Sequence, residues 1–225
     1  MKHFAILLLV VAAGTLIAAP APKEKGYFPI DIQKQGNKEV LGMFAGGDET
    51  NILKDFPTGD KKFGDVTFKV EKKMIMLGST AQKTEPAKVE GIAVGRAASR
   101  LHFLHANGYG GGPNKEGSAW FVKDGTTIGS YAVHYEDNTT AEIPIVYGEH
   151  TRDWFYQDDP EPTKAKVAWS GDNDYATARA SKIRVYQMTW ENPKPDKKIV
   201  SIDFAGRKEE TPAAPFVIAI TAEVK

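Results

Sequence analysis

The sequence predicts an all-β protein, a two-sheet antiparallel sandwich of jelly-roll type. Three observations support this class. Short segments alternate between apolar and polar residues, turn residues separate these segments at intervals of roughly 10 to 15 residues, and no window carries a long helical apolar stripe. Many short strands with regular turns are typical of sandwiches and jelly rolls.

The clearest β signal lies in residues 118–149. Residues 128–135 alternate, a turn follows at Glu136, Asp137 and Asn138, and residues 141–147 alternate again. Two alternating runs joined by a short polar turn predict a β-hairpin.

Further strands are expected wherever a short alternating or apolar run is bounded by turn residues. These runs are residues 27–32, 66–70, 74–77, 92–94, 101–104, 167–170, 183–190, 199–204 and 216–224. The strand at 183–190 should end at Asn192, because the residue before a proline favours extended geometry. We expect the strand at 199–204 to pair with the last strand of the chain.

The connections between these runs are rich in glycine, proline and charge. Residues 37–56 predict a loop-rich excursion, and residues 107–117 a glycine-rich loop around Tyr109. Residues 157–166 form a polar loop, and residues 171–180 a loop with one helical turn.

The N-terminus has the three parts of a secretory signal peptide. Lys2 gives a basic start, an unbroken apolar run follows, and small residues lead to Pro20 and Pro22. We expect a signal peptide over residues 1–19 with cleavage at 18–21, a tether over 20–26, and one β-sandwich domain over 27–225. An uncleaved N-terminal anchor is the alternative. The expected location is secreted or periplasmic, with no membrane span after cleavage, because no later run approaches the ~20 apolar residues of a spanning helix.

Charge and cysteine content narrow the function classes. The chain has 29 basic and 29 acidic residues and no cysteine. Balanced charge gives no reason to expect a nucleic-acid partner. Without disulfides, an exported chain of this length must be stabilised by its core.

The C-terminal two thirds resembles a known family. The order of residues 56–70, 99–106, 128–148, 152–155 and 188–204 is similar to galactose-binding-like β-sandwich domains, and the resemblance spans residues 56–224. Such domains are appended to bacterial glycoside hydrolases or stand alone in bacteria. The resemblance implies a carbohydrate-binding module, with most of these segments defining the fold.

Loop aromatic residues are the candidates for ligand contact. Aromatic rings stack on the apolar face of a pyranose, while polar groups take its hydroxyls. The candidates are Tyr109 in the glycine-rich loop, Trp154 and Tyr156 after the hairpin, and Trp169. For each tryptophan, core or edge packing is the competing interpretation.

Acidic loops suggest a structural calcium ion. Asp48, Asp158 and Asp172 lie in three loops that offer hard oxygen ligands, although none has the fixed spacing of a dedicated calcium loop. Solvated acidic loops are the alternative. A zinc site on His102 and His105 is disfavoured, because three-residue spacing points them to opposite faces of a strand.

No catalytic motif is recognisable. Asp158 and Asp159 are adjacent in one loop, which does not set an acid and a base across a substrate. The leading hypothesis is therefore an exported, non-catalytic module that binds polysaccharide through loop aromatics. The alternatives are an exported structural or protein-interaction sandwich without a sugar site, and a secreted glycoside hydrolase.

Overall fold

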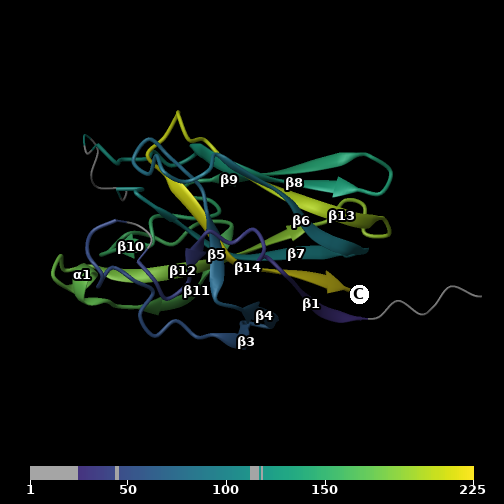
Figure 1. Ribbon diagram of the computed structural model, residues 1–225, viewed down its shortest axis with the longest axis horizontal. Coiled ribbons are helices and arrows are strands. Elements are labelled where there is room, and N and C mark those ends of the chain that lie inside the picture. The colour runs from purple at the N-terminus through teal and green to yellow at the C-terminus, as the bar shows by residue number, and fades with distance from the viewer. Residues whose placement is uncertain (1–24, 44–45, 112–116, 118) are drawn as a thin grey trace, which may run out of the picture.

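The computed structural model describes residues 25–43, 46–111, 117 and 119–225 (Figure 1). These residues form antiparallel β-sheets with one short helix, and the all-β class is as the sequence predicts. The expected signal peptide and most of the tether lie outside the described residues. Within those residues, no helix is long and apolar enough to cross a membrane.

The larger sheet forms the middle layer of the molecule. Its strand order is β10-β12-β7-β14-β5-β2, with β1 also paired to β14 and β11 also paired to β12. The strands are β1 (Gly26–Ile30), β2 (Lys38–Glu39), β5 (Lys73–Met76), β7 (Arg100–Gly108), β10 (Phe155–Tyr156), β11 (Ala165–Gly171), β12 (Lys182–Glu191) and β14 (Ala214–Val224).

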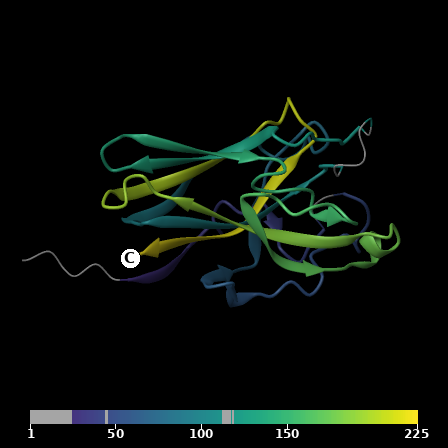
Figure 2. The ribbon, with the colours of Figure 1, turned by 180° about the vertical axis from the view of Figure 1, so that it is seen from behind.

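A four-stranded sheet covers one face of the larger sheet (Figures 1 and 2). Its order is β6-β13-β8-β9, and its strands are β6 (Lys88–Ala97), β13 (Lys198–Gly206), β8 (Thr127–Tyr135) and β9 (Thr140–Val146). The predicted hairpin is confirmed, because β8 pairs antiparallel with β9. Alternating residues of β8 are buried, among them Tyr131 and Val133, and they face the larger sheet.

The pairing expected for residues 199–204 is wrong. That segment is β13, which pairs with β6 and β8, whereas the last strand β14 pairs with β7, β5 and β1. The two strands belong to opposite sheets, and both bury apolar side chains in the core between them, including Ile202 and Ile220. β13 and β14 are consecutive in the sequence, but they do not become neighbours in one sheet.

The second face of the larger sheet is also covered. The hairpin of β3 (Gly59–Phe63) and β4 (Val66–Val70), the excursion over residues 40–56 and the helix α1 (Asp174–Thr177) form a second apolar cluster on it. Strands β7 and β14 are consequently buried on both faces, which explains their nearly continuous burial.

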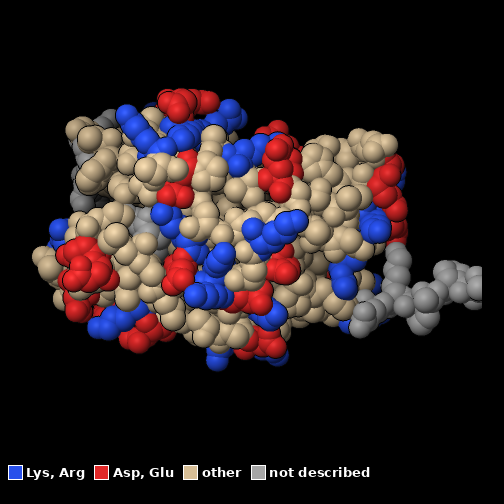
Figure 3. Space-filling view, viewed as in Figure 1, with Lys and Arg blue, Asp and Glu red and all other residues tan. Residues whose placement is uncertain are grey.

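The two histidines of β7 follow the predicted geometry. The Nδ1 atom of His102 contacts Thr189 and its Nε2 atom contacts Glu223, whereas His105 contacts Tyr131 and the His150 carbonyl in the core between the sheets. They have separate partners on opposite faces of the strand. On the face drawn in Figure 3, acidic and basic side chains are interspersed.

Candidate functional site

A pocket of about 650 Å³ opens at one end of the larger sheet. It is formed by loops that are far apart in the sequence: the excursion after β2, the loop after β5, the β7–β8 connection, the β9–β11 connection and the segment around α1. Its lining residues are Gly46, Gly47, Asn51, Ala81, Tyr109, Gly111, Trp120, Asp153, Trp154, Phe155, Tyr156, Gln157, Asp158, Asp159, Tyr175, Arg179 and Ser181.

Asp153 lines the pocket and joins two of its loops through hydrogen bonds. Its Oδ2 atom accepts hydrogen bonds from the backbone N–H groups of Gly110 at 2.7 Å and Gly111 at 3.1 Å, and its Oδ1 atom accepts one from Phe155 at 3.0 Å. The carboxylate thus ties the glycine-rich loop to the start of β10. Burial raises the pKa of Asp153 from its ordinary value of 3.8 to about 6, although the three hydrogen bonds oppose this shift.

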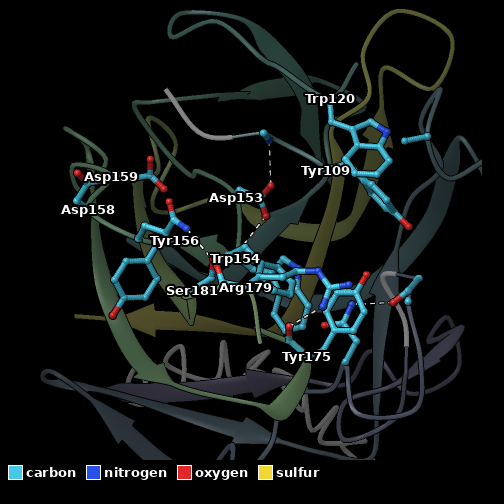
Figure 4. A pocket seen from close by; sticks show the side chains of 17 residues that line it. Tyr109, Trp120, Asp153, Trp154, Tyr156, Asp158, Asp159, Tyr175, Arg179 and Ser181 are labelled. Carbon is cyan, nitrogen blue, oxygen red and sulfur yellow. Dashed lines mark hydrogen bonds between the residues drawn. The ribbon is translucent and has the colours of Figure 1, made fainter. Parts of the chain in front are cut away.

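Two aromatic groups face each other across the pocket (Figure 4). Tyr109 and Trp120 lie on one side with their ring centroids 5.7 Å apart in an edge-to-face arrangement, and Tyr156 lies on the other side beside Asp158 and Asp159. Trp120 is 52 % exposed, which is unusual for so large an apolar side chain. An exposed indole at the mouth of a pocket can lie against the apolar face of a ligand.

The ring of Tyr156 is supported from behind. The guanidinium carbon of Arg184 lies 4.4 Å from its ring centroid, and Arg184 is only 2 % exposed. Arg184 also donates a hydrogen bond to the Asp159 carbonyl at 3.2 Å. The buried cation therefore fixes both the tyrosine ring and the following acidic loop.

The helix α1 places Tyr175 at the pocket, and Arg179 follows just after the helix. Asn173 caps the helix by accepting a hydrogen bond from the Ala176 N–H at 2.6 Å, and its amide donates to the Ile52 carbonyl at 2.8 Å. Asn173 thereby ties the helix to the excursion. The guanidinium of Arg179 lies over the Tyr175 ring at 3.5 Å from its centroid.

Two glycines allow the excursion to approach these aromatic rings. A Cβ atom on Gly46 would lie 2.7 Å from the Tyr109 hydroxyl, and one on Gly47 would lie 2.6 Å from Cε2 of Tyr175. Both glycines have positive φ angles, 77° and 91°. Glycine is required here for the close approach as well as for the backbone conformation.

The structure separates the four predicted ligand-binding aromatics. Tyr109 and Tyr156 line the pocket, and both are partly buried. Trp154 touches the pocket but is 1 % exposed, and its indole packs against Phe155 and Phe216 in the second apolar cluster. Trp154 is therefore a core residue and offers no free face for stacking.

Trp169 lies outside the pocket lining. It sits on β11, half-buried, and packs edge-to-face against Phe56 with ring centroids 5.0 Å apart. Trp169 therefore packs against the second apolar cluster, which is the alternative interpretation of this tryptophan.

The predicted calcium ligands are not brought together. Asp158 lines the pocket, whereas Asp48 and Asp172 do not. The carboxylate of Asp48 accepts hydrogen bonds from the N–H and hydroxyl of Thr50, which lower its pKa. Across the part of the chain that the structure describes, no three His, Asp or Glu side chains form a group that could hold a metal ion.

A scan against models of known protein families finds no match, and a search of curated proteins finds no similar sequence.

Sequence reasoning missed several pocket residues, namely Asn51, Trp120, Asp153, Tyr175 and Arg179. Trp120 falls within the β signal of residues 118–149, but residues 119–122 form no strand. Its position beside the glycine-rich loop was the signal available. The other residues lie in separate loops, and only the fold brings them together.

Proposed function

We propose that this protein is an exported, non-catalytic module that binds glycan in the pocket between Trp120 and Tyr156. The observation that carries the proposal is the combination of an exposed indole, two partly buried tyrosine side chains and carboxylates around one open cavity. A sugar ring has apolar C–H faces and polar edges, so it needs aromatic surface and hydrogen-bonding groups together.

The roles of the carboxylates support binding without catalysis. Asp153 already accepts three backbone hydrogen bonds, so its first role is to hold the pocket loops. Asp158 and Asp159 are consecutive in the loop after β10 and lie on the same side of the cavity as Tyr156 (Figure 4). Neither arrangement is that of an acid and a base facing each other across a bound ring.

We also propose that the two sheets form a jelly-roll sandwich and that the chain is exported. Two antiparallel sheets pack face to face through one apolar cluster, which supports a jelly-roll sandwich of the galactose-binding-like kind. The basic, apolar and small-residue segments at the N-terminus support export through a signal peptide.

Calorimetric titration of the purified protein with plant, algal and bacterial polysaccharides tests the binding proposal. We expect saturable binding to at least one glycan, weakened about fivefold to tenfold by Trp120→Ala, because the indole supplies part of the stacking surface. Val200→Ala removes an exposed apolar side chain from β13, away from the pocket, and should leave the affinity unchanged.

Two results would contradict the proposal. Absence of binding across the whole panel would exclude a glycan site, and equal affinity of the Trp120→Ala variant and the unaltered protein would exclude this pocket. Release of reducing sugar from any polysaccharide in the panel would show that the module is catalytic.

A further inference from the structure

The charged side chains lining the pocket are mostly acidic. Asp153, Asp158 and Asp159 contribute carboxyl groups, and Arg179 is the cationic side chain among the described lining residues. A ligand inside this cavity therefore meets more negative than positive charge. The overall chain is neutral, so this excess is a local property of the pocket.

Arg179 is exposed, but its guanidinium is held by contacts with Tyr175. Its guanidinium stacks on Tyr175, and its NH1 group donates a hydrogen bond to the Tyr175 carbonyl at 2.9 Å. Arg184, the nearby buried cation, lies behind Tyr156 and is absent from the pocket lining. Neither arginine is arranged as a clamp for an anionic ligand.

The pocket lining also includes a residue with a buried acceptor that has no partner. Asn51 is 2 % exposed and lines the pocket, and its amide nitrogen donates to the Gly46 carbonyl at 2.7 Å. That bond fixes the amide orientation, because a carbonyl oxygen can only accept. The Oδ1 atom of Asn51 then has no hydrogen-bond partner among the described residues. A buried acceptor of this kind is satisfied by a donor from a ligand or a water molecule.

The pocket thus offers hydrogen-bond acceptors and negative charge on the side opposite an exposed indole. Protonated amines suit all three features, since they donate hydrogen bonds, pair with carboxylates and interact favourably with an indole face.

We propose that the pocket selects glycans that carry protonated amino groups over neutral and acidic glycans. This inference rests on the proposed glycan-binding function and names the ligand class of the same site. The amino group lies near Asp158 and Asp159, while the sugar ring lies against Trp120. Uronic acid and sulfated units are disfavoured by repulsion from the same carboxylates.

The test compares three oligomers of equal length. These are a glucosamine oligomer, its N-acetylated counterpart and a galacturonic acid oligomer, each titrated by calorimetry at a pH at which the amines are protonated. The first two differ in the acetyl group on the nitrogen, which removes the charge and adds bulk, so the carboxylate variants and the salt dependence are needed to identify the part due to charge. We expect the glucosamine oligomer to bind about tenfold more tightly than the N-acetylated one, with galacturonate weakest.

Charge-neutralising variants locate the effect. Asp158→Asn combined with Asp159→Asn should reduce the tenfold preference to about twofold or less, and both side chains are exposed enough to be replaced without loss of folding. Asp65→Asn, in the β3–β4 turn, neutralises an exposed carboxylate outside the pocket and should keep the full preference. Added salt should weaken the glucosamine complex and leave the N-acetylated one nearly unchanged.

The outcomes separate this inference from the function on which it rests. Equal binding of the charged and N-acetylated oligomers, with loss of both in Trp120→Ala, overturns the amine preference and supports glycan binding. Tighter binding of galacturonate likewise overturns the preference. Failure of all three oligomers and of the wider panel overturns both proposals.

Discussion

The carboxylate of Asp153 accepts a hydrogen bond from the Gly110 N–H at 2.7 Å, and this contact joins two loops 43 residues apart. The Gly111 N–H adds a second bond to the same oxygen. The loop that carries Tyr109 is thereby held against the segment that carries Tyr156. The shape of the pocket depends on this carboxylate.

Asp153 should make the folded protein less stable as the pH rises. Its pKa lies near 6 in the folded chain and near 3.8 when exposed, so between these values the folded state binds more protons. The free energy of unfolding then falls with rising pH across this window, by about 3 kcal/mol for this group. Asp153→Asn removes the titration, and urea denaturation from pH 4 to pH 7 measures its contribution as a difference from the unaltered protein.

His105 should act in the opposite direction over nearly the same range. Its Nε2–H group donates to the His150 carbonyl at 3.0 Å, and burial lowers its pKa from 6.5 to about 4. The unfolded chain binds the additional proton between these values, so stability is lost as the pH falls through the window, again by about 3 kcal/mol. In the His105→Gln variant, the glutamine amide can still donate a hydrogen bond to the His150 carbonyl, but it does not titrate.

In the unaltered protein, the opposite pH dependences that Asp153 and His105 give to the free energy of unfolding largely cancel. The Asp153→Asn variant should therefore become markedly less stable on acidification from pH 6.5 to pH 4. The His105→Gln variant should become more stable on the same acidification. Identical pH slopes for both variants and the unaltered protein would contradict the assignment.

Substitution of Trp154 should mainly lower stability, whereas substitution of Trp120 should mainly weaken binding. Trp154 is 1 % exposed in the second apolar cluster, so Trp154→Ala should lower the free energy of unfolding by about 3–5 kcal/mol. Trp120 is 52 % exposed, so Trp120→Ala should change it by less than about 0.5 kcal/mol while weakening glycan binding. Chemical denaturation measures both, and a large loss of stability in Trp120→Ala would refute the surface role.

Gly47 should be more sensitive to substitution than another glycine of similar backbone geometry. Gly47 and Gly59 have φ angles of 91° and 80°, so alanine at either position carries a similar backbone cost of about 1–2 kcal/mol. Only at Gly47 does the new Cβ collide with a side chain, at 2.6 Å from Tyr175, whereas nothing lies within 4 Å at Gly59. Gly47→Ala should lose additional stability and affinity in denaturation and titration experiments. Equal losses in the two variants would show that the contact with Tyr175 is unimportant.

The N-terminal segment should direct export and be removed. The protein recovered from the exported fraction of a bacterial host should begin between residues 19 and 22, as measured by N-terminal sequencing. Replacing Leu8 with arginine interrupts the apolar run and should keep the chain in the cytoplasm. Recovery of an exported chain that starts at Met1 would contradict cleavage.

The sequence predicted the local elements better than their partners. Alternation in residues 128–135 and 141–147 identified the β8–β9 hairpin, because one face of each strand is buried. The pairing of β13 was missed, since apolar residues such as Ile202 show that a strand is buried and do not show which sheet contains it. Trp154 and Trp120 were likewise indistinguishable by residue type, and their burial follows from contacts between distant loops.

The most direct test of glycan binding at this pocket follows the indole N–H signals by NMR during a glycan titration. The chain has four tryptophans, so each indole can be assigned by substitution. The account predicts that the Trp120 signal shifts saturably, while the signal of Trp190, on β12 outside the pocket lining, stays in place. A saturable shift at Trp190 with no change at Trp120, or no shift with any glycan, would contradict it.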